Sequence, residues 1–413
     1  MRPRGDRRKP SNSDRRDDLR FVCPGRVWEG WRQGCRMVQS LPVFMKRSLP
    51  IIALVLMALI GGGRTADAKP IHAAVEAAKA FVEAEAFNGV VLIAGDADAP
   101  AFTLAHGIAN AETNTVATPE TAYHIGSISK WFTTLVALRL VDRGELTLDA
   151  PLGPWLPALP EETATRVQLV HLLSNASGIP DGVMAAFRED RRIVDLPLSA
   201  RQAAERYGRG ALQWTPGEGW DYALTNWVLV RAILERATGR SFETLIDEEI
   251  IRPMGLQHTG VPVRNRLGEA PGVAAAYAAL TPEPKRNMPP VPTYAAAAGT
   301  LYSTAEDLRR AADIVYEGTF LSSGALQDLS TVRVAEQDYA LGGRMRRVAM
   351  GAGVPDLRVP WETGAMGGFK TLLAHVPGDG VTIVILNNTD RSQSSLNELA
   401  EQLLRAIYAP PAE

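Results

Sequence analysis

An amphipathic stretch followed by a wholly apolar one marks the first predicted elements. In the segment IHAAVEAAKAFVEAEAF, Ile71, Val75 and Val82 recur at the spacing of one helix face. Asn88-Gly89 then interrupts this pattern before the continuous apolar run VVLIAG, which is typical of a buried strand. The sequence therefore predicts a helix that leads directly into a buried strand.

A second predicted helix begins with polar residues and then turns almost wholly apolar, in HIGSISKWFTTLVALRL. It starts near Ser127 and ends where Gly144 supplies a C-terminal stop. One face of this helix is predicted to consist of Ile128, Trp131, Leu135 and Leu138.

The last third of the chain alternates between helical and strand patterns. Ser303 and Glu306 are spaced as a capping box at the start of a helix. The apolar runs FKTLLAHV and VTIVILNN flank the turn residues 377–380, which predicts an antiparallel hairpin. A final amphipathic helix is predicted in LNELAEQLLRAIY.

Strand patterns near both ends, with helical patterns between them, indicate an α/β sheet domain that carries a mostly helical insert. The N- and C-terminal strands are expected to pair in one sheet. We place the sheet subdomain at about 69–125 and 295–410, and the helical subdomain at about 126–294.

The first 68 residues do not resemble folded protein. Residues 1–44 are rich in arginine and lack an apolar period, so we interpret them as a non-native extension, with a cytoplasmic basic arm as the alternative. Residues 45–68 have the layout of a signal peptide: a basic start, an apolar run and an A-x-A site that ends at Ala68. The run is too short to span a bilayer. We expect export to the periplasm or the medium, with no stable membrane anchor after cleavage.

The net charge of the remaining chain excludes one class of partner. Of the 44 Lys and Arg residues, 14 precede residue 69, whereas only 6 of the 46 Asp and Glu residues do, which leaves a net charge of −10. Nucleic-acid binding usually requires a basic face, so we expect no nucleic acid as a partner. Both cysteines, Cys23 and Cys35, lie in the first 68 residues, so the remaining chain has no disulfide.

Ser127 and Lys130 are the first candidates for chemistry. Residues three apart on a helix share a face, so the lysine amine could take the serine proton. The helix N-terminus adds a partial positive charge and free N–H groups that favour an oxyanion. The alternative is that Ser127 caps the helix and Lys130 is a solvated surface residue, because Ser-x-x-Lys alone is a weak motif.

Five segments, taken in order, carry a more specific pattern. They are AYHIGSISKWFTTLVALRLVDRGELTLDAPL, VQLVHLLSNASGIPD, DYALTNWVLVRAILERATGRSFETLIDEEIIRPMGLQHTG, AGTLYSTAEDL and ETGAMGGFKTLLAHVPGDGVTIVILNN. Together, over about residues 75–408, they resemble the serine β-lactamase-like family, in the branch of class C β-lactamases, D-alanyl-D-alanine carboxypeptidases and family VIII-type esterases. The resemblance implies an α/β (α+β) fold of the β-lactamase/transpeptidase type, with an antiparallel sheet flanked by helices and a mostly helical subdomain.

The resemblance also implies roles for individual residues. Ser127 matches the nucleophile, Lys130 the general base, and Tyr222 the tyrosine that exchanges protons with the serine and the leaving group. The backbone N–H groups of Ser127 and Ala365 are implied to form the oxyanion hole. The triplet that lines the substrate site in this family matches Glu362, Thr363 and Gly364.

Two positions depart from the family pattern. The family asparagine is Leu224 here, and Asn226 lies two residues too far along to be assumed equivalent. Glu362 stands where the family has lysine or histidine. A charged Glu362 about 4 Å from a substrate carboxylate would repel it by roughly 4 kcal/mol at an effective dielectric near 20. The alternative is a rim residue that points away from the substrate.

From this pattern we expect an exported serine hydrolase that forms an acyl-Ser127 intermediate with an ester, amide or peptide. Its type is expected to be esterase or D-peptidase rather than efficient β-lactamase. The alternative is an inactive binding or sensor protein on the same fold. Its partner is a small-molecule or peptide substrate, no cofactor is expected, and the oligomeric state is left open.

Several other polar residues are expected to have structural roles. His124 and His171 are interpreted as polar groups in turns, and Asp181 and Asp221 as solvated turn residues. No metal site is expected, because metal-ligand spacing is lacking among His72, His106, His258 and His375.

Overall fold

The computed structural model describes four stretches of the chain, namely residues 70–85, 87–262, 272–351 and 353–409. The predicted extension and signal peptide therefore lie outside the described residues. Within these stretches, no helix is long and apolar enough to cross a membrane.

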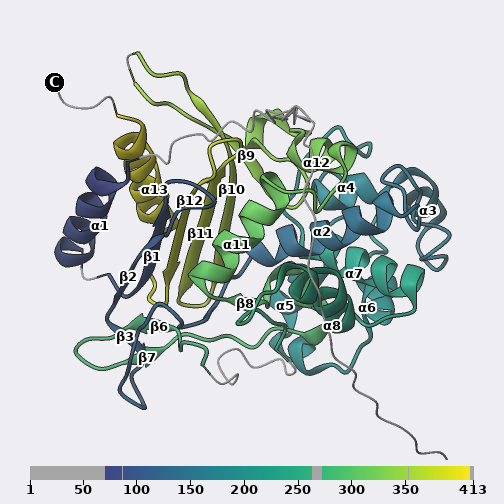
Figure 1. The fold of residues 1–413 in the computed structure, drawn as a ribbon. Coiled ribbons are helices and arrows are strands. Elements are labelled where there is room, and N and C mark those ends of the chain that lie inside the picture. Colours follow the sequence, from purple (N-terminus) through teal and green to yellow (C-terminus); the bar gives the residue numbers. More distant parts are fainter. Residues whose placement is uncertain (1–69, 86, 263–271, 352, 410–413) are drawn as a thin grey trace, which may run out of the picture. The chain divides into compact units, whose positions relative to one another are not determined.

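A six-stranded antiparallel sheet joins the two ends of the described chain (Figure 1). Its strands are β1 (Gly89–Ala94), β2 (Phe102–His106), β9 (Arg344–Val348), β10 (Leu357–Met366), β11 (Phe369–Val376) and β12 (Val381–Asn387). Their order in the sheet is β2-β1-β12-β11-β10-β9, with every neighbour antiparallel. Val91 lies opposite Ile385, so the N-terminal strand pairs with the C-terminal one. The predicted pairing of the chain ends and the predicted β11–β12 hairpin are confirmed.

Helices cover both faces of this sheet (Figure 1). On one face lie α1 (His72–Ala84) and α13 (Gln393–Tyr408), and on the other lie α2 (Ile128–Asp142) and α11 (Ala305–Tyr316). In β1, Val91 and Ile93 pack toward α1 and α13, whereas Val90 and Leu92 pack toward α2 and α11. Because both faces are buried, the strand is apolar at consecutive positions, and the predicted α/β class of an antiparallel sheet flanked by helices is confirmed.

A second group of helices and turns lies between the strands of the sheet in the sequence. The helices are α3 (Glu161–Arg166), α4 (Leu169–Leu173), α5 (Gly182–Glu189), α6 (Ala200–Tyr207), α7 (Leu224–Thr238), α8 (Phe242–Ile246), α9 (Arg252–Met254), α10 (Ala296–Gly299) and α12 (Ser323–Ser330). Short helical turns are η1 (Arg191–Asp195), η2 (Asp247–Ile251), η3 (Thr293–Ala295) and η4 (Ala335–Gln337). Short strands pair as β3 (Ile108–Asn110) with β4 (Thr115–Val116), β5 (Tyr123–His124) with β8 (Tyr302–Ser303), and β6 (Tyr277–Ala279) with β7 (Lys285–Arg286). The subdomain boundaries stay a prediction.

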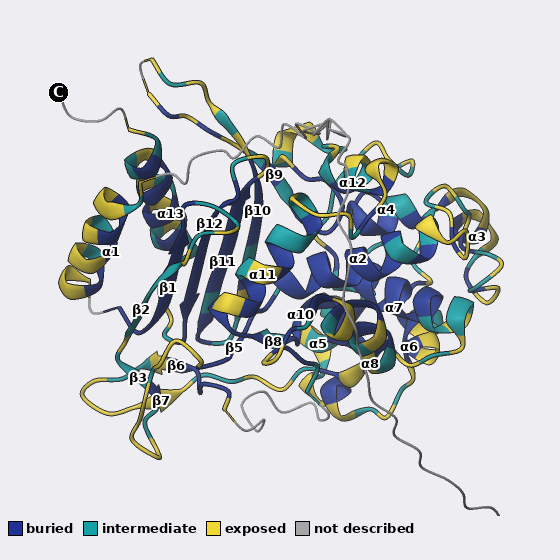
Figure 2. Cartoon of the chain, viewed as in Figure 1, coloured by how far each residue is buried: buried dark blue, intermediate teal, exposed yellow. Residues whose placement is uncertain are grey.

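Helix α2 is buried on all sides, not on one face (Figure 2). Twelve of its fifteen residues are buried, because it lies between β10 and β11 on one side and α7, α10 and α12 on the others. Two of its buried polar side chains make hydrogen bonds inside the protein, whereas Thr134 Oγ1 has no hydrogen-bond partner among the described residues. Thr133 Oγ1 donates to Ala297 O at 2.8 Å, and Ser129 Oγ accepts from Leu301 N at 3.1 Å. The predicted apolar face of Ile128, Trp131, Leu135 and Leu138 is buried, and the burial extends to the other sides of the helix.

The start of α11 also differs from the prediction. Thr304, not Ser303, is the N-cap, and its hydroxyl accepts from Asp307 N at 3.2 Å. Ser303 lies in β8, where its hydroxyl is 2.8 Å from Thr259 Oγ1. The prediction of a capping box from Ser303 and Glu306 was wrong, because Ser303 belongs to a strand pair with β5 and the N-cap is the next residue.

Candidate active site

Ser127 lies in a tight turn that leads into α2. Ser129 N donates to Gly126 O at 3.0 Å, and Ser127 is the N-cap, with its side chain half-buried. Gly126 has a φ of +54°, a conformation that disfavours side chains. A β-carbon at Gly126 would lie 2.7 Å from Ala365 N, so the turn lies directly against the backbone of β10.

Lys130 follows Ser127 by one helical turn and points back toward it. Its Nζ donates to Ser127 Oγ at 3.1 Å and to Ala298 O at 2.5 Å. The residue is only 4 % exposed, so the interpretation of a solvated surface lysine was wrong. The two residues that sequence spacing placed on one helix face are thus in hydrogen-bond contact.

Tyr222 completes the predicted trio from a different element, the loop before α7. The centre of its ring lies 4.7 Å from Lys130 Nζ, and the residue is 39 % exposed, so it faces both the lysine and solvent. Its ring packs edge-on against Tyr339 at 6.2 Å between ring centres. The structure therefore brings Ser127, Lys130 and Tyr222 together.

Asp181 fixes the loop that carries Tyr222. One carboxylate oxygen accepts from Leu224 N at 2.7 Å, and the other accepts from Thr225 Oγ1 at 2.9 Å and from Met184 N at 3.2 Å. Asp181 thus caps both α5 and the start of α7. The prediction of a solvated turn residue was wrong for Asp181.

The end of β10 forms the wall opposite α7. Strand β9 pairs with β10 only as far as Trp361, so residues 362–366 have a strand neighbour on one side only, β11. A β-carbon at Gly364 would overlap Ile125 O, to which Thr371 Oγ1 donates at 2.9 Å. This contact holds Gly364 and Ala365 beside the turn of Ser127. The backbone N–H of Ala365 is the predicted second oxyanion donor.

Glu362 lies in the protein interior behind this wall. It is 6 % exposed, and its carboxylate packs against Gly343, where a β-carbon would overlap it. Burial raises the pKa of Glu362 to about 8, against a smaller opposite effect of the Arg344 charge. At neutral pH the residue is therefore mostly protonated. The alternative of a residue on the solvent-exposed rim was wrong, and the repulsion of substrate carboxylates stays a prediction.

We expect Glu362→Gln to remove part of the pH dependence of stability. A carboxyl whose pKa rises from 4.5 to about 8 on folding binds its proton more tightly in the folded state. The wild type should therefore lose free energy of unfolding as the pH rises from about 5 to 9, on the order of 3–5 kcal/mol for this group. Urea titrations at pH 5, 7 and 9 should show a smaller loss in the variant. Glu398→Gln, on the exposed side of α13, is the control; equal pH slopes in all three proteins would contradict the assignment.

The two histidines near the site make structural hydrogen bonds. His124 Nδ1 lies 3.0 Å from Thr300 O, and burial lowers its pKa to about 4, so the ring is neutral. His171 Nδ1 accepts from Gln168 N at 3.1 Å, within the cap of α4. Among the described residues, no group of three or more His, Cys, Asp or Glu side chains could hold a metal ion.

Leu224 and Asn226 have different surroundings. Asn226 is buried, and its amide oxygen accepts from Ser177 Oγ at 2.7 Å while its nitrogen donates to Asn175 Oδ1 at 3.2 Å. Both ends of the Asn226 amide are thus hydrogen-bonded to other side chains inside the protein. Leu224 instead lines a cavity of about 220 Å³. The lining consists of Val183, Met184, Phe187, Ile193, Val194, Leu224, Pro289, Pro290, Val291, Pro292, Ala295, Gly299 and Met366.

Sequence reasoning missed this cavity. Its residues come from α5, η1, the start of α7, a proline-rich segment, η3, α10 and the end of β10, and none of them is polar. The one signal in the sequence was Leu224 at the family asparagine position.

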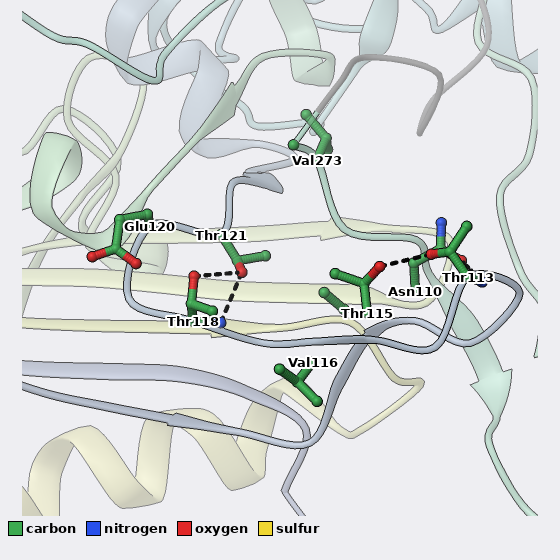
Figure 3. Close-up of a pocket in the computed structure, with 10 residues that line it drawn as sticks. Asn110, Thr113, Thr115, Val116, Thr118, Glu120, Thr121 and Val273 are labelled. Atoms are coloured by element: carbon green, nitrogen blue, oxygen red, sulfur yellow. Dashed lines mark hydrogen bonds between the residues drawn. The ribbon is translucent and has the colours of Figure 1, made fainter.

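A larger cavity of about 440 Å³ lies elsewhere, beside β3 and β4 (Figure 3). Its threonine hydroxyls are partly paired with each other, as in the 2.7 Å contact between Thr113 and Thr115. None of Ser127, Lys130 and Tyr222 lines it. We therefore assign no part of the candidate site to this cavity.

Comparisons with known proteins show the family of the chain and the fold. The family model described as Beta-lactamase matches residues 74–407. Esterase EstB of Burkholderia gladioli is 30% identical over 245 residues, which cover 51% of this chain and 61% of the esterase, less than two thirds of its length. Penicillin-binding protein 4 of Amycolatopsis lactamdurans is 27% identical over 343 residues, 75% of this chain and 85% of that protein.

A solved structure shows the same fold. The penicillin binding protein from Bacillus halodurans superposes with a TM-score of 0.67 at 21% identity, over 79% of this chain and 98% of that chain. At this identity, the likeness concerns the fold alone.

Proposed function

Because the chain belongs to the β-lactamase family of serine hydrolases, we propose that it hydrolyses an ester or amide through an acyl-Ser127 intermediate. The observation that carries this proposal is the contact of 3.1 Å between a buried Lys130 Nζ and Ser127 Oγ. If Ser127 only capped α2, it would not need a buried lysine beside it. The relatives named as an esterase and a penicillin-binding protein support this reaction class.

The proposed reaction begins when Ser127 Oγ attacks the carbonyl carbon and its proton passes to Lys130 Nζ. The carbonyl oxygen becomes an oxyanion, which the N–H groups of Ser127 and Ala365 stabilise. Collapse of this intermediate breaks the bond to the leaving group, which receives the proton through Lys130 and Tyr222. Water then attacks the acyl carbon and gives its proton to the same pair. The bond between the acyl carbon and Ser127 Oγ breaks, Ser127 Oγ takes this proton, and the acid is released.

We propose an esterase or D-peptidase type rather than an efficient β-lactamase. Leu224 offers no amide to a polar group on the acyl side of a substrate, and a buried polar group left without a partner costs about 1–3 kcal/mol. A substrate with few polar groups at this position avoids that cost. The apolar cavity beside Leu224 supports the same preference.

The proposal is tested by labelling the purified protein with a fluorophosphonate and measuring its intact mass. We expect one adduct on the wild type and none on Ser127→Ala. A folded wild type that takes up no label would contradict catalysis and support the alternative of a binding or sensor protein. An adduct that persists in Ser127→Ala would place the nucleophile elsewhere.

We further propose that the chain is exported and cleaved after Ala68. The support is the order of charged, apolar and small residues over positions 45–68. The mass of protein recovered from the periplasm or medium should correspond to a chain that starts at Lys69. Recovery of the chain only in the cytoplasm, with residues 45–68 retained, would contradict export.

A further inference from the structure

The apolar cavity that Leu224 lines lies next to the predicted oxyanion hole. Met366, one of its lining residues, directly follows Ala365 in β10. Gly299 lies across from it: a β-carbon there would be 3.1 Å from Met366 Cε and 3.7 Å from the carbonyl carbon of Gly126. The inner end of the cavity is thus close to the peptide that carries Ser127.

The cavity lies on the acyl side of the reacting carbonyl. Lys130 and Tyr222 must face the leaving group, because they deliver its proton, and neither residue lines the cavity. Its lining instead includes Met366, which lies in β10 next to Ala365, the residue that supplies the predicted N–H donor. A substrate whose carbonyl oxygen lies in the oxyanion hole would therefore direct its acyl chain toward Met366 and away from Lys130.

The chemistry of the lining restricts what binds there. Every lining side chain is apolar, and no charged or hydroxyl group is among them. An apolar cavity of about 150 Å³ is large enough for benzene, so about 220 Å³ accommodates a phenyl ring or an alkyl chain of about four to eight carbons. A charged or strongly polar chain would lose its hydration without gaining a partner.

We propose that this cavity, the acyl pocket, binds an uncharged apolar acyl group and selects such substrates. The inference rests on the proposed function and adds the substrate class. Met184, on α5, and Leu224, at the start of α7, are the specificity-determining residues that can be altered without touching Ser127, Lys130 or Tyr222.

The first experiment compares kcat/KM for p-nitrophenyl esters from acetyl to decanoyl, together with the monoester of adipic acid. Each buried methylene should increase kcat/KM roughly fourfold, so hexanoyl should exceed acetyl on the order of 100-fold. The increase should stop at about eight carbons, when the pocket is full. The adipoyl ester, with its terminal carboxylate, should return close to the acetyl value.

Variants then locate the effect. Met184→Trp fills the pocket and should reduce the hexanoyl-to-acetyl ratio at least tenfold. Leu224→Asn, which adds an amide without adding bulk, should reduce the same ratio and guards against a folding defect in the first variant. Val116→Trp, which adds one heavy atom more at the other cavity (Figure 3), should leave the ratio unchanged. Equal ratios in the wild type and both pocket variants would overturn the proposal.

A binding measurement separates this inference from catalysis. Primary amides from acetamide to octanamide are titrated into Ser127→Ala, and dissociation constants are measured by ligand-observed NMR. Affinity should increase at least tenfold from acetamide to hexanamide, and Met184→Trp in the same background should abolish the increase. Absence of turnover with this chain-length dependence intact would refute the proposed function alone. Affinity independent of chain length would refute the acyl pocket, whatever the turnover.

Discussion

Replacing Lys130 by methionine is expected to lower kcat/KM for an ester about 100- to 10,000-fold while the protein stays folded. The methionine keeps the length of the side chain between the rings of Tyr222 and Trp227 but cannot accept the proton of Ser127. General base catalysis contributes about 10²–10⁴-fold in such reactions. Ala298 O also loses its donor, which costs about 1–3 kcal/mol of stability.

The measurement is kcat/KM for the best ester, with the melting temperature as a check on folding. Lys79→Met is the matched control, since Lys79 is an exposed residue of α1 whose amine contacts Glu76 at 2.9 Å and lies 5.8 Å from the centre of the Phe102 ring, away from the candidate site. We expect the control to retain full activity. If Lys130→Met keeps more than a tenth of the wild-type kcat/KM, Lys130 is not the general base.

Gly364→Ala is expected to damage both stability and catalysis. Its new β-carbon would overlap Ile125 O and crowd Thr371 Oγ1, so β10 would have to move away from the turn of Ser127. Overpacking of this kind costs about 1–3 kcal/mol. Misplacing one oxyanion donor lowers kcat about 10²–10³-fold, so the fluorophosphonate labelling rate should decrease by a comparable factor.

Gly324→Ala provides the matched control for this substitution. Gly324 lies in α12, where the nearest atom to a new β-carbon is Ser322 Oγ at 3.8 Å. Alanine is a better helix former than glycine, so the control should be neutral or slightly stabilising. A Gly364→Ala protein that labels as fast as this control would show that β10 does not need its close approach to the nucleophile turn.

The sequence predicted the elements whose signal is local. A run such as VTIVILNN has few stable alternatives to a buried strand, and Ser127 and Lys130 are separated by less than one helical turn. Their contact therefore follows from helix geometry alone. The family resemblance added Tyr222, which is far away in the sequence and which the structure places against Lys130.

Features that depend on several distant segments could not be predicted in this way. The sequence named one apolar face of α2, and its other faces are covered by α7, α10 and α12, which are distant in the sequence. The burial of Glu362 depends on Gly343 in the turn before β9. The acyl pocket combines apolar residues that have no chemical signature in the sequence. In each case the local pattern was correct, but the burial of the residues depends on tertiary contacts with segments that are distant in the sequence.

The pairing of β1 with β12 sets the order in which the protein can fold. Asn88, just before β1, donates a hydrogen bond to Asn388, 300 residues later in the chain. During synthesis, β1 and β11 lack the strand that lies between them until Val381–Asn387 has left the ribosome. Contacts of such high sequence separation form late and slowly. A nascent chain thus lacks the strand that joins the two halves of its sheet until residue 387 has been synthesised.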